Sequence, residues 1–402
     1  MVAVALAVIG TRLPAVDAAE GPAMNADVSG AARSVCIGDV DRYRVREPLF
    51  ECVRVVLAKR GETYTPEYLQ GISGAAFRIA GICPCAPTCS AAMPTEKLVE
   101  TLGYQVRRVG LDDSGEDARK QIQRLAEACK ANGGALPTED RLDTPQLKVL
   151  QRQTAALTEA VKAEIRAGRP AIVWHAFTAA EYDVVAGFDD DRGIFLGRGS
   201  YAGGGADLAS ASQARTLEAV YVGGPPTAIL IGAKQGPFDA PKAEIAALQE
   251  AVRHAYSTRN RDQVGQKPWM FLEGLAAYDQ WLRHFGDPTA KRGSGDAYCY
   301  GIYRSTHRAA AGFLREIAPK HPQGQAHLTE AATHFQAEAD VLKDAESLLS
   351  WKSPEGPDAA RNARVVETLT KARAEYAAGI AGIRKALGAL GAPVEVAVPA
   401  GE

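Results

Sequence analysis

The sequence PLFECVRVVLAKRG at residues 48–61 has the pattern of an amphipathic α-helix. Its apolar residues recur at the spacing of one helical face, Cys52 lies on that face, and Gly61 ends the pattern. A second short helix is predicted to begin at Pro66, because Thr65 is a good N-cap and proline is favoured at the first helical position. The sequence therefore places a cysteine on the buried side of a helix.

Strands are predicted both before and after two long helices. The helices are expected at about 115–131 and 145–167, and an acidic, glycine-ended turn at 189–193 predicts a β-hairpin. The predicted strands are 104–109, 171–174, 182–188, 194–196, 219–222 and 228–231. This mixture predicts an α+β domain with a small antiparallel sheet and a central helix that carries the cysteine.

The pattern changes near residues 235–240, after which no strand is predicted. The segments 241–256, 269–284, 296–317, 325–350 and 358–388 are each amphipathic with a helical period. Five consecutive helices imply an all-helical domain with its own core. The predicted organisation is a signal segment and linker (1–35), an α+β domain (36–238), a helical domain (239–390) and a tail (391–402).

Charge and hydropathy exclude several classes of partner. Lys and Arg total 46 against 48 for Asp and Glu, so the net charge of −2 gives no reason to expect nucleic acid. No stretch has the ~18 apolar residues that a membrane span needs, so none is predicted in the mature chain.

The first residues have two interpretations. An apolar run at 2–9 and small residues at 15–19 are typical of an export signal, although no positive charge precedes the run. Export to the periplasm or the medium is favoured, and a cytoplasmic location stays open.

Several short motifs together resemble the family of butirosin-biosynthesis protein H, whose N-terminal domain is an acyltransferase relative of the papain-like, leader-processing cysteine peptidases. The motifs are LFECVRVVLAKRG (49–61), YTPEYL (64–69), GISGAAF (71–77), GRPAIVW (168–174), VVAGFD (184–189), GLAAYDQW (274–281) and RSTHRAAAGFL (304–314). The resemblance implies a papain-like fold followed by the family's helical domain.

The resemblance also implies a thiol site at Cys52, the family's nucleophile position. Where the family has its histidine, this chain has Glu181, and His175 on the preceding strand is the remaining candidate base. The acid expected near 197–199 is absent, and Arg46 stands where a glutamine would help to hold an oxyanion. A thiolate needs such helpers, because the free thiol has a pKa of about 8.5.

Six further residues are candidates for binding the substrate. Tyr182 and Arg198 flank the predicted site, and four others are expected to line a cleft between the two domains: Tyr278, Trp281, Arg304 and Arg308. Ordinary helix-core and surface roles are the alternative for these four.

The seven cysteines include a cluster at Cys83, Cys85 and Cys89. Loop disulfides are the favoured interpretation in an exported protein, with free thiols or zinc as alternatives, since spacings of one and three residues are not typical of structural zinc sites. The glycine-rich segment 197–205 lacks the Lys-Ser/Thr of a phosphate loop. No cofactor and no metal are predicted.

Two functional hypotheses follow. In the first, the protein is a thiol acyltransferase or amide hydrolase that forms an acyl-enzyme on Cys52 with His175 as base and Glu181 orienting or replacing it. In the second, it keeps a papain-like fold without catalysis and binds a peptide or small molecule. A ring nitrogen of His175 beside the sulfur in an open cleft favours the first; a sulfur buried in the core favours the second. The oligomeric state is not predicted.

Overall fold

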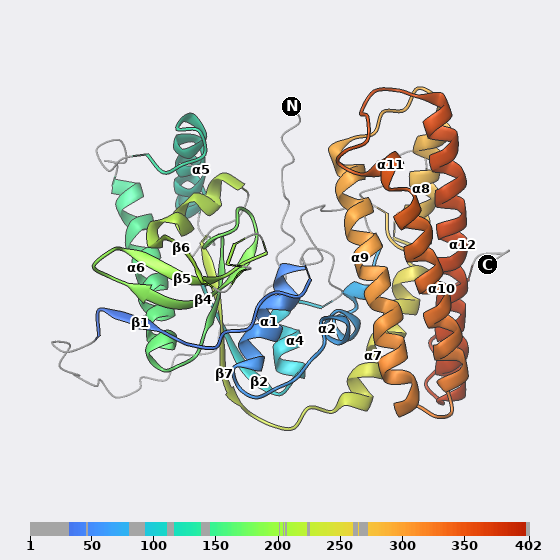
Figure 1. Ribbon diagram of the computed structural model, residues 1–402, viewed down its shortest axis with the longest axis horizontal. Helices are drawn as coiled ribbons and strands as arrows, with labels where there is room; N and C mark the ends of the chain where they lie inside the picture. Colours follow the sequence, from blue (N-terminus) through green and yellow to red (C-terminus); the bar gives the residue numbers. More distant parts are fainter. Residues whose placement is uncertain are drawn as a thin grey trace.

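The computed structural model describes residues 32–45, 47–79, 93–110, 116–137, 145–200, 202–203, 205, 207–222, 226–259, 264 and 272–398. Within these ranges the chain is an α+β protein: an antiparallel sheet carries helices on its faces, and a helical bundle follows it (Figure 1). The predicted fold class is confirmed at this level. The predicted signal segment, Arg46 and the cluster Cys83, Cys85 and Cys89 lie outside the described residues.

The sheet joins seven strands in the described chain. They are β1 (Ser34–Cys36), β2 (Tyr104–Gly110), β3 (Ala171–Trp174), β4 (Tyr182–Asp189), β5 (Ile194–Arg198), β6 (Ala209–Ser212) and β7 (Thr227–Lys234). The strand order is β2-β7-β3-β4-β5-β6, and β1 pairs with the end of β4 that β3 leaves free. All these pairings are antiparallel, and β2 lies at one edge.

Helices account for most of the rest. Those that precede or interrupt the sheet are α1 (Pro48–Ala58), α2 (Pro66–Ile72), η1 (Ala75–Phe77), α4 (Thr95–Thr101), α5 (Glu116–Ala131), α6 (Pro145–Arg166) and η3 (Gln213–Val222). Those that follow are α7 (Ala240–Ala255), α8 (Leu275–Gly286), α9 (Ser294–Ile317), η6 (Ala318–Lys320), α10 (Gln325–Asp344), α11 (Glu346–Leu349) and α12 (Ala359–Ala389). The change from mixed strands and helices to helices alone, predicted near 235–240, coincides with the segment between β7 and α7.

The central strands are covered on both faces. Helix α1 packs on β3 and β4, and α6 packs on β2, β3, β4 and β7 from the other side (Figure 1). Residues 183–188 of β4 are accordingly all buried. This two-sided burial explains why β3 and β4 are almost continuous apolar runs in the sequence.

Two secondary-structure predictions were wrong, and two strands were missed. The segment 219–222 is the end of the 3₁₀ helix η3 and not a strand, because Leu217 and Val220, three residues apart, pack together on Leu125, Cys129 and Leu150 of α5 and α6. The helix predicted over 325–350 is interrupted at Ala345. The short strands β1 and β6 were not predicted, since three or four residues carry too little periodicity.

The segment after η1 joins the sheet-bearing part to the bundle. Phe77 packs its ring on Phe313 of α9 and Phe335 of α10. Backbone groups of residues 77–79 are hydrogen-bonded by side chains or amides of four helices: Tyr376 Oη donates to Phe77 O (2.9 Å), His307 Nε2 to Arg78 O (3.2 Å) and Gly274 N–H to Ile79 O (2.9 Å), while Ile79 N–H donates to His254 Nε2 (3.0 Å). The apolar core is continuous across this junction.

Contact between α2 and α9 depends on a glycine. A Cβ built on Gly71 would lie 2.1 Å from a ring carbon of Phe313, whereas one on Gly301, in an open part of α9, would meet nothing within 4 Å. We therefore expect Gly71→Ala to lower the free energy of unfolding by about 1–3 kcal/mol, the usual cost of overpacking.

The matched control is Gly301→Ala, expected to stabilise by about 0.5–1 kcal/mol because alanine is the better helix former. Urea unfolding followed by circular dichroism compares the two. Equal effects of the two substitutions would contradict close packing of α2 on α9.

Candidate functional site

The sulfur of Cys52 lies in the interior of the protein. Cys52 falls in the second turn of α1 and is 0% exposed, within the main apolar core. Among the described residues, Tyr43 Oη lies at hydrogen-bond distance from Sγ (2.8 Å), and the Tyr43 hydroxyl donates to Tyr182 O at 3.3 Å. The hydroxyl of Tyr43 is thus in direct contact with the buried thiol.

Burial and charge both keep this thiol protonated. Burial raises the pKa of Cys52 well above its ordinary value, and the hydrogen bond between Tyr43 and Cys52 offsets only part of that. The carboxylates of Asp183, Glu51 and Glu181 raise the pKa further. A nucleophilic cysteine requires the opposite, a cation or a helix N-terminus that stabilises the thiolate.

His175 contacts other groups. Its Nδ1 accepts a hydrogen bond from the amide of Ala180 (2.9 Å), and its Nε2 lies 3.9 Å from Oε2 of Glu218 on η3. Burial and the charge of Arg215 lower the pKa of His175 to about 4, so the ring is neutral at pH 7. No hydrogen bond or ion pair joins His175 to Cys52 in the described part of the chain, and the pairing of the two stays a prediction.

Asp183 is a site residue that sequence reasoning missed. It is 0% exposed on β4, and its Oδ2 accepts the amides of Phe177 (2.6 Å) and Thr178 (2.8 Å). Burial nevertheless dominates and raises the pKa of Asp183 to about 7. An aspartate next to the apolar run 184–188 was the available signal, because a buried strand position seldom carries a carboxylate.

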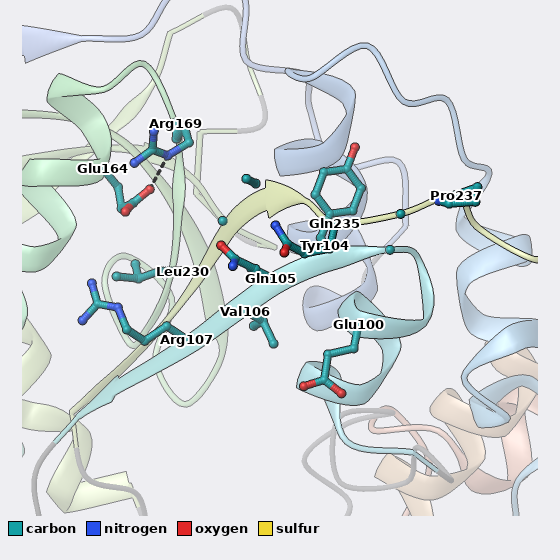
Figure 2. Close-up of a pocket in the computed structure, with 14 residues that line it drawn as sticks. Glu100, Tyr104, Gln105, Val106, Arg107, Glu164, Arg169, Leu230, Gln235 and Pro237 are labelled. Atoms are coloured by element: carbon teal, nitrogen blue, oxygen red, sulfur yellow. Dashed lines mark hydrogen bonds and ion pairs between the residues drawn. The ribbon is translucent and has the colours of Figure 1, made fainter. Parts of the chain in front are cut away.

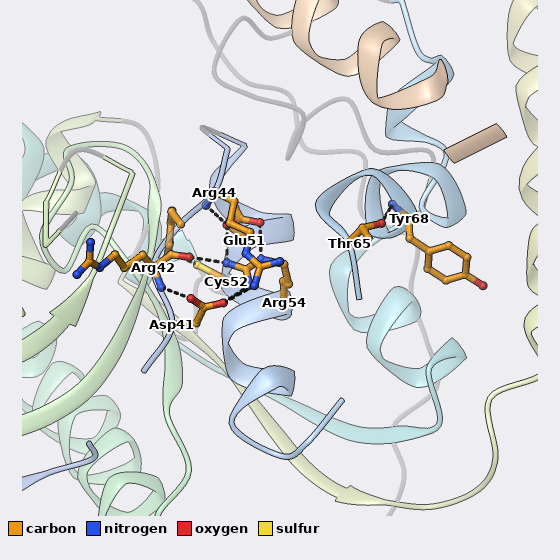
Figure 3. Close-up of polar contacts among 9 residues, drawn as sticks. Asp41, Arg42, Arg44, Glu51, Cys52, Arg54, Thr65 and Tyr68 are labelled. Atoms are coloured by element: carbon orange, nitrogen blue, oxygen red, sulfur yellow. Dashed lines mark hydrogen bonds and ion pairs between the residues drawn. The ribbon is translucent and has the colours of Figure 1, made fainter. Parts of the chain in front are cut away.

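A buried ion-pair network sets the position of Tyr43. Arg54 Nε donates to Glu51 Oε1 (2.7 Å) and its Nη1 to Asp41 Oδ2 (2.6 Å), while the amide of Arg44 donates to the second oxygen of Glu51. Figure 3 shows Arg54 between these two acids, beside Cys52. The network fixes residues 41–44 across the start of α1, so Tyr43 is directed at the sulfur.

The six predicted substrate-binding residues are not gathered at one place. Tyr182 packs edge-on against Trp174, Arg198 donates to the carbonyls of its own loop, and Tyr278 and Trp281 are buried in the bundle core, where Trp281 Nε1 donates to Asp296. Arg304 pairs with Glu346 on the surface, and Arg308 is exposed on α9. The proposed inter-domain cleft at Tyr278 and Trp281 is therefore wrong, since both side chains are core residues.

A pocket of about 1000 Å³ lies elsewhere, at the β2 edge of the sheet (Figure 2). Strands β2 and β7 form its floor, and the ends of α6 and α4 contribute to its rim. Its lining is Glu100, Gly103, Tyr104, Gln105, Val106, Arg107, Glu164, Arg169, Leu230, Gly232, Ala233, Gln235, Gly236 and Pro237. No candidate site residue from the sequence lines it, because a pocket between distant segments has no local pattern.

Comparison with protein-family models, with curated proteins and with solved structures gives no significant match. Across the described residues no group of three or more His, Cys, Asp or Glu side chains is arranged to hold a metal ion. The helices in those residues also include none that is long and apolar enough to cross a membrane.

The Arg54 network predicts that replacing Arg54 destabilises the protein far more than replacing Arg44. Arg54 is 2% exposed and its loss leaves Glu51 buried without its partner, so Arg54→Met should lower the free energy of unfolding by about 3–5 kcal/mol. The matched control, Arg44→Met, removes only an exposed ion pair with Asp41 and should cost at most about 1 kcal/mol. Similar costs for both, in denaturant titrations, would contradict a buried network.

Asp183 predicts a pH effect on stability. A folded pKa of about 7, above the unfolded value of 3.8, means that the native state holds the proton more tightly. The stabilising contribution of Asp183 to the free energy of unfolding is therefore complete below pH 4. It is lost as the pH rises through 7, a change on the order of 4 kcal/mol. Asp183→Asn should remove this loss.

The measurement is the difference in unfolding free energy between wild type and Asp183→Asn from pH 4 to pH 8. The pKa values of His175 and His254 are lowered to about 4 and about 3, so these two side chains reduce the free energy of unfolding as the pH falls below 6.5. Their effect is the same in both proteins and cancels in the difference. A difference that does not change with pH would refute the assignment.

Proposed function

We propose that this protein is a non-catalytic, papain-like relative of the butirosin-biosynthesis protein H family that binds a peptide or small molecule. The short motifs from 49 to 314 and the packing of a cysteine-bearing helix on an antiparallel sheet support the fold assignment. The environment of Cys52 is the observation on which the functional part depends.

Acyl transfer through a cysteine has three requirements: a thiolate, a base or cation beside it, and access for a carbonyl. The buried sulfur, its raised pKa and the three surrounding carboxylates oppose the first two. The 2.8 Å contact with Tyr43, held by the Arg54 network, opposes the third. The geometry therefore favours binding over the competing hypothesis of an acyl-enzyme on Cys52.

The pocket at the β2 edge supports a binding function independently. Its volume of about 1000 Å³ is at the upper end of the range that small-molecule and peptide sites occupy. Polar and apolar side chains, including Gln105, Arg107, Val106 and Leu230, line the same space. A site of this kind needs no nucleophile.

The test is alkylation of the native protein with iodoacetamide between pH 6 and pH 9, read by mass spectrometry. Cys36 is an internal reference, because it is free and exposed on β1. We expect Cys36 to be labelled in the native state and Cys52 only after denaturation, with Cys52 at least about 100-fold slower, since only the accessible thiolate reacts.

The competing enzyme hypothesis makes the opposite prediction. Native labelling of Cys52 that is as fast as that of Cys36, saturates below pH 7 and is lost in His175→Ala would refute the binding proposal and establish an activated thiol. A Cys52→Ala variant, which retains the small apolar core position, confirms the peptide assignment in the mass spectra.

A further inference from the structure

Strand β2 forms an edge of the sheet over seven residues. Among the described strands it pairs with β7 alone, so its other side has no strand partner. An edge of this length offers backbone N–H and C=O groups to an added strand. Several peptide-binding domains use an exposed edge in this way, with side-chain pockets alongside it for specificity.

The pocket follows this edge. Residues 103–107, which include the first half of β2, line it together with Leu230 and Gly232 of β7 (Figure 2). Gly232 contributes to the hollow, because any Cβ there would lie 3.0 Å from that of Gln105. The space is therefore adjacent to the backbone that an added strand would contact.

Within the described part of the chain, one charged side chain of the pocket lining has no ion-pair partner. Glu164 pairs with Arg169 at 2.5 Å, and Glu100 with Lys97 at 3.7 Å. Both carboxylates of the lining are thus neutralised. Arg107 is exposed and forms no ion pair within the described residues, so it is the cation available to a ligand.

The neighbouring arginine, Arg108, differs from Arg107 because it has a carboxylate partner. Arg108 projects to the other face of β2, where Glu96 binds its guanidinium, and it also bonds the hydroxyl of Tyr182. Alternation along the strand therefore places Arg107 and Arg108 on opposite faces of β2, and of the two only Arg107 lines the pocket.

From this combination we propose that the edge of β2 binds an extended, acidic peptide, which adds a strand to the sheet and places a carboxylate against Arg107. The inference rests on the proposed binding function and names its site and ligand class. A peptide is favoured over a small anion because the edge supplies a row of backbone partners beside the single charge. Pairing of β2 with a second copy of itself would bring two Arg107 side chains near each other, so it is disfavoured.

The experiment selects ligands from a random nine-residue peptide library displayed on phage, using the full-length chain as bait. Enriched sequences should be rich in Asp and Glu and in β-branched residues. The best synthetic peptide is then titrated by fluorescence polarisation. Arg107→Glu should weaken binding at least about 10-fold, the effect of losing one charged hydrogen bond.

The matched control is Arg192→Glu, the same charge change on the exposed turn between β4 and β5. Strand β4 is three strands from β2 in the sheet, a separation of about 14 Å that exceeds the screening length, so the affinity should stay within about 2-fold. Thermal melting checks that both variants are folded. Hydrogen exchange of the peptide complex should show added protection at those amides of residues 104–110 that face away from β7.

Three outcomes would overturn the inference: no enriched peptide, enrichment without acidic residues, or binding that Arg107→Glu leaves unchanged. Peptides that protect another surface while Cys52 stays unreactive would overturn this site and leave the proposed function standing. Rapid native alkylation of Cys52 would instead remove the proposed function, whatever the peptide result.

Discussion

The capture of residues 77–79 by the helical bundle holds the two parts of this protein together. A buried backbone group without a partner costs as much as a lost hydrogen bond, so a non-helical segment can enter a helical core only where side chains satisfy it. Here His254, His307, Tyr376 and the amide of Gly274 do so from α7, α9, α12 and the start of α8. The aromatic packing of Phe77 fills the space between them.

Two buried carboxylates support this junction. Glu338 accepts His307 Nδ1 at 2.7 Å and also the hydroxyl of Tyr278, while Glu244 accepts Tyr68 Oη and His321 Nε2, both at 2.7 Å. Since buried charges are expensive to desolvate, such pairs stabilise the fold little, but they strongly penalise any packing that separates them. They specify how α2 and η1 dock, whereas the apolar contacts supply most of the free energy.

The sequence predicted elements well where a period extends over several turns, as in α1, α6 and α12, or where a buried strand is a continuous apolar run, as in β3. It failed where structure depends on distant partners. Nothing near Cys52 in the sequence reveals that Asp183 and Tyr43 lie beside it, because strand register and the Arg54 network bring them there. The apolar stripe of α1 correctly indicated that the cysteine faces inward, and the missing histidine agreed with that burial. The β2 pocket had no sequence signal, since its lining comes from four separate elements.

The junction also has a consequence for the modularity of the chain. The change from mixed strands and helices to helices alone near 235–240 resembles a domain boundary. The bundle nevertheless obtains part of its interior from residues 77–79, far upstream. In a helical half separated at that point, His254, His307 and Tyr376 would lose their hydrogen-bond partners in residues 77–79. The helical half therefore shares its core with the sheet-bearing half, and we expect each half to be less stable alone than in the whole chain.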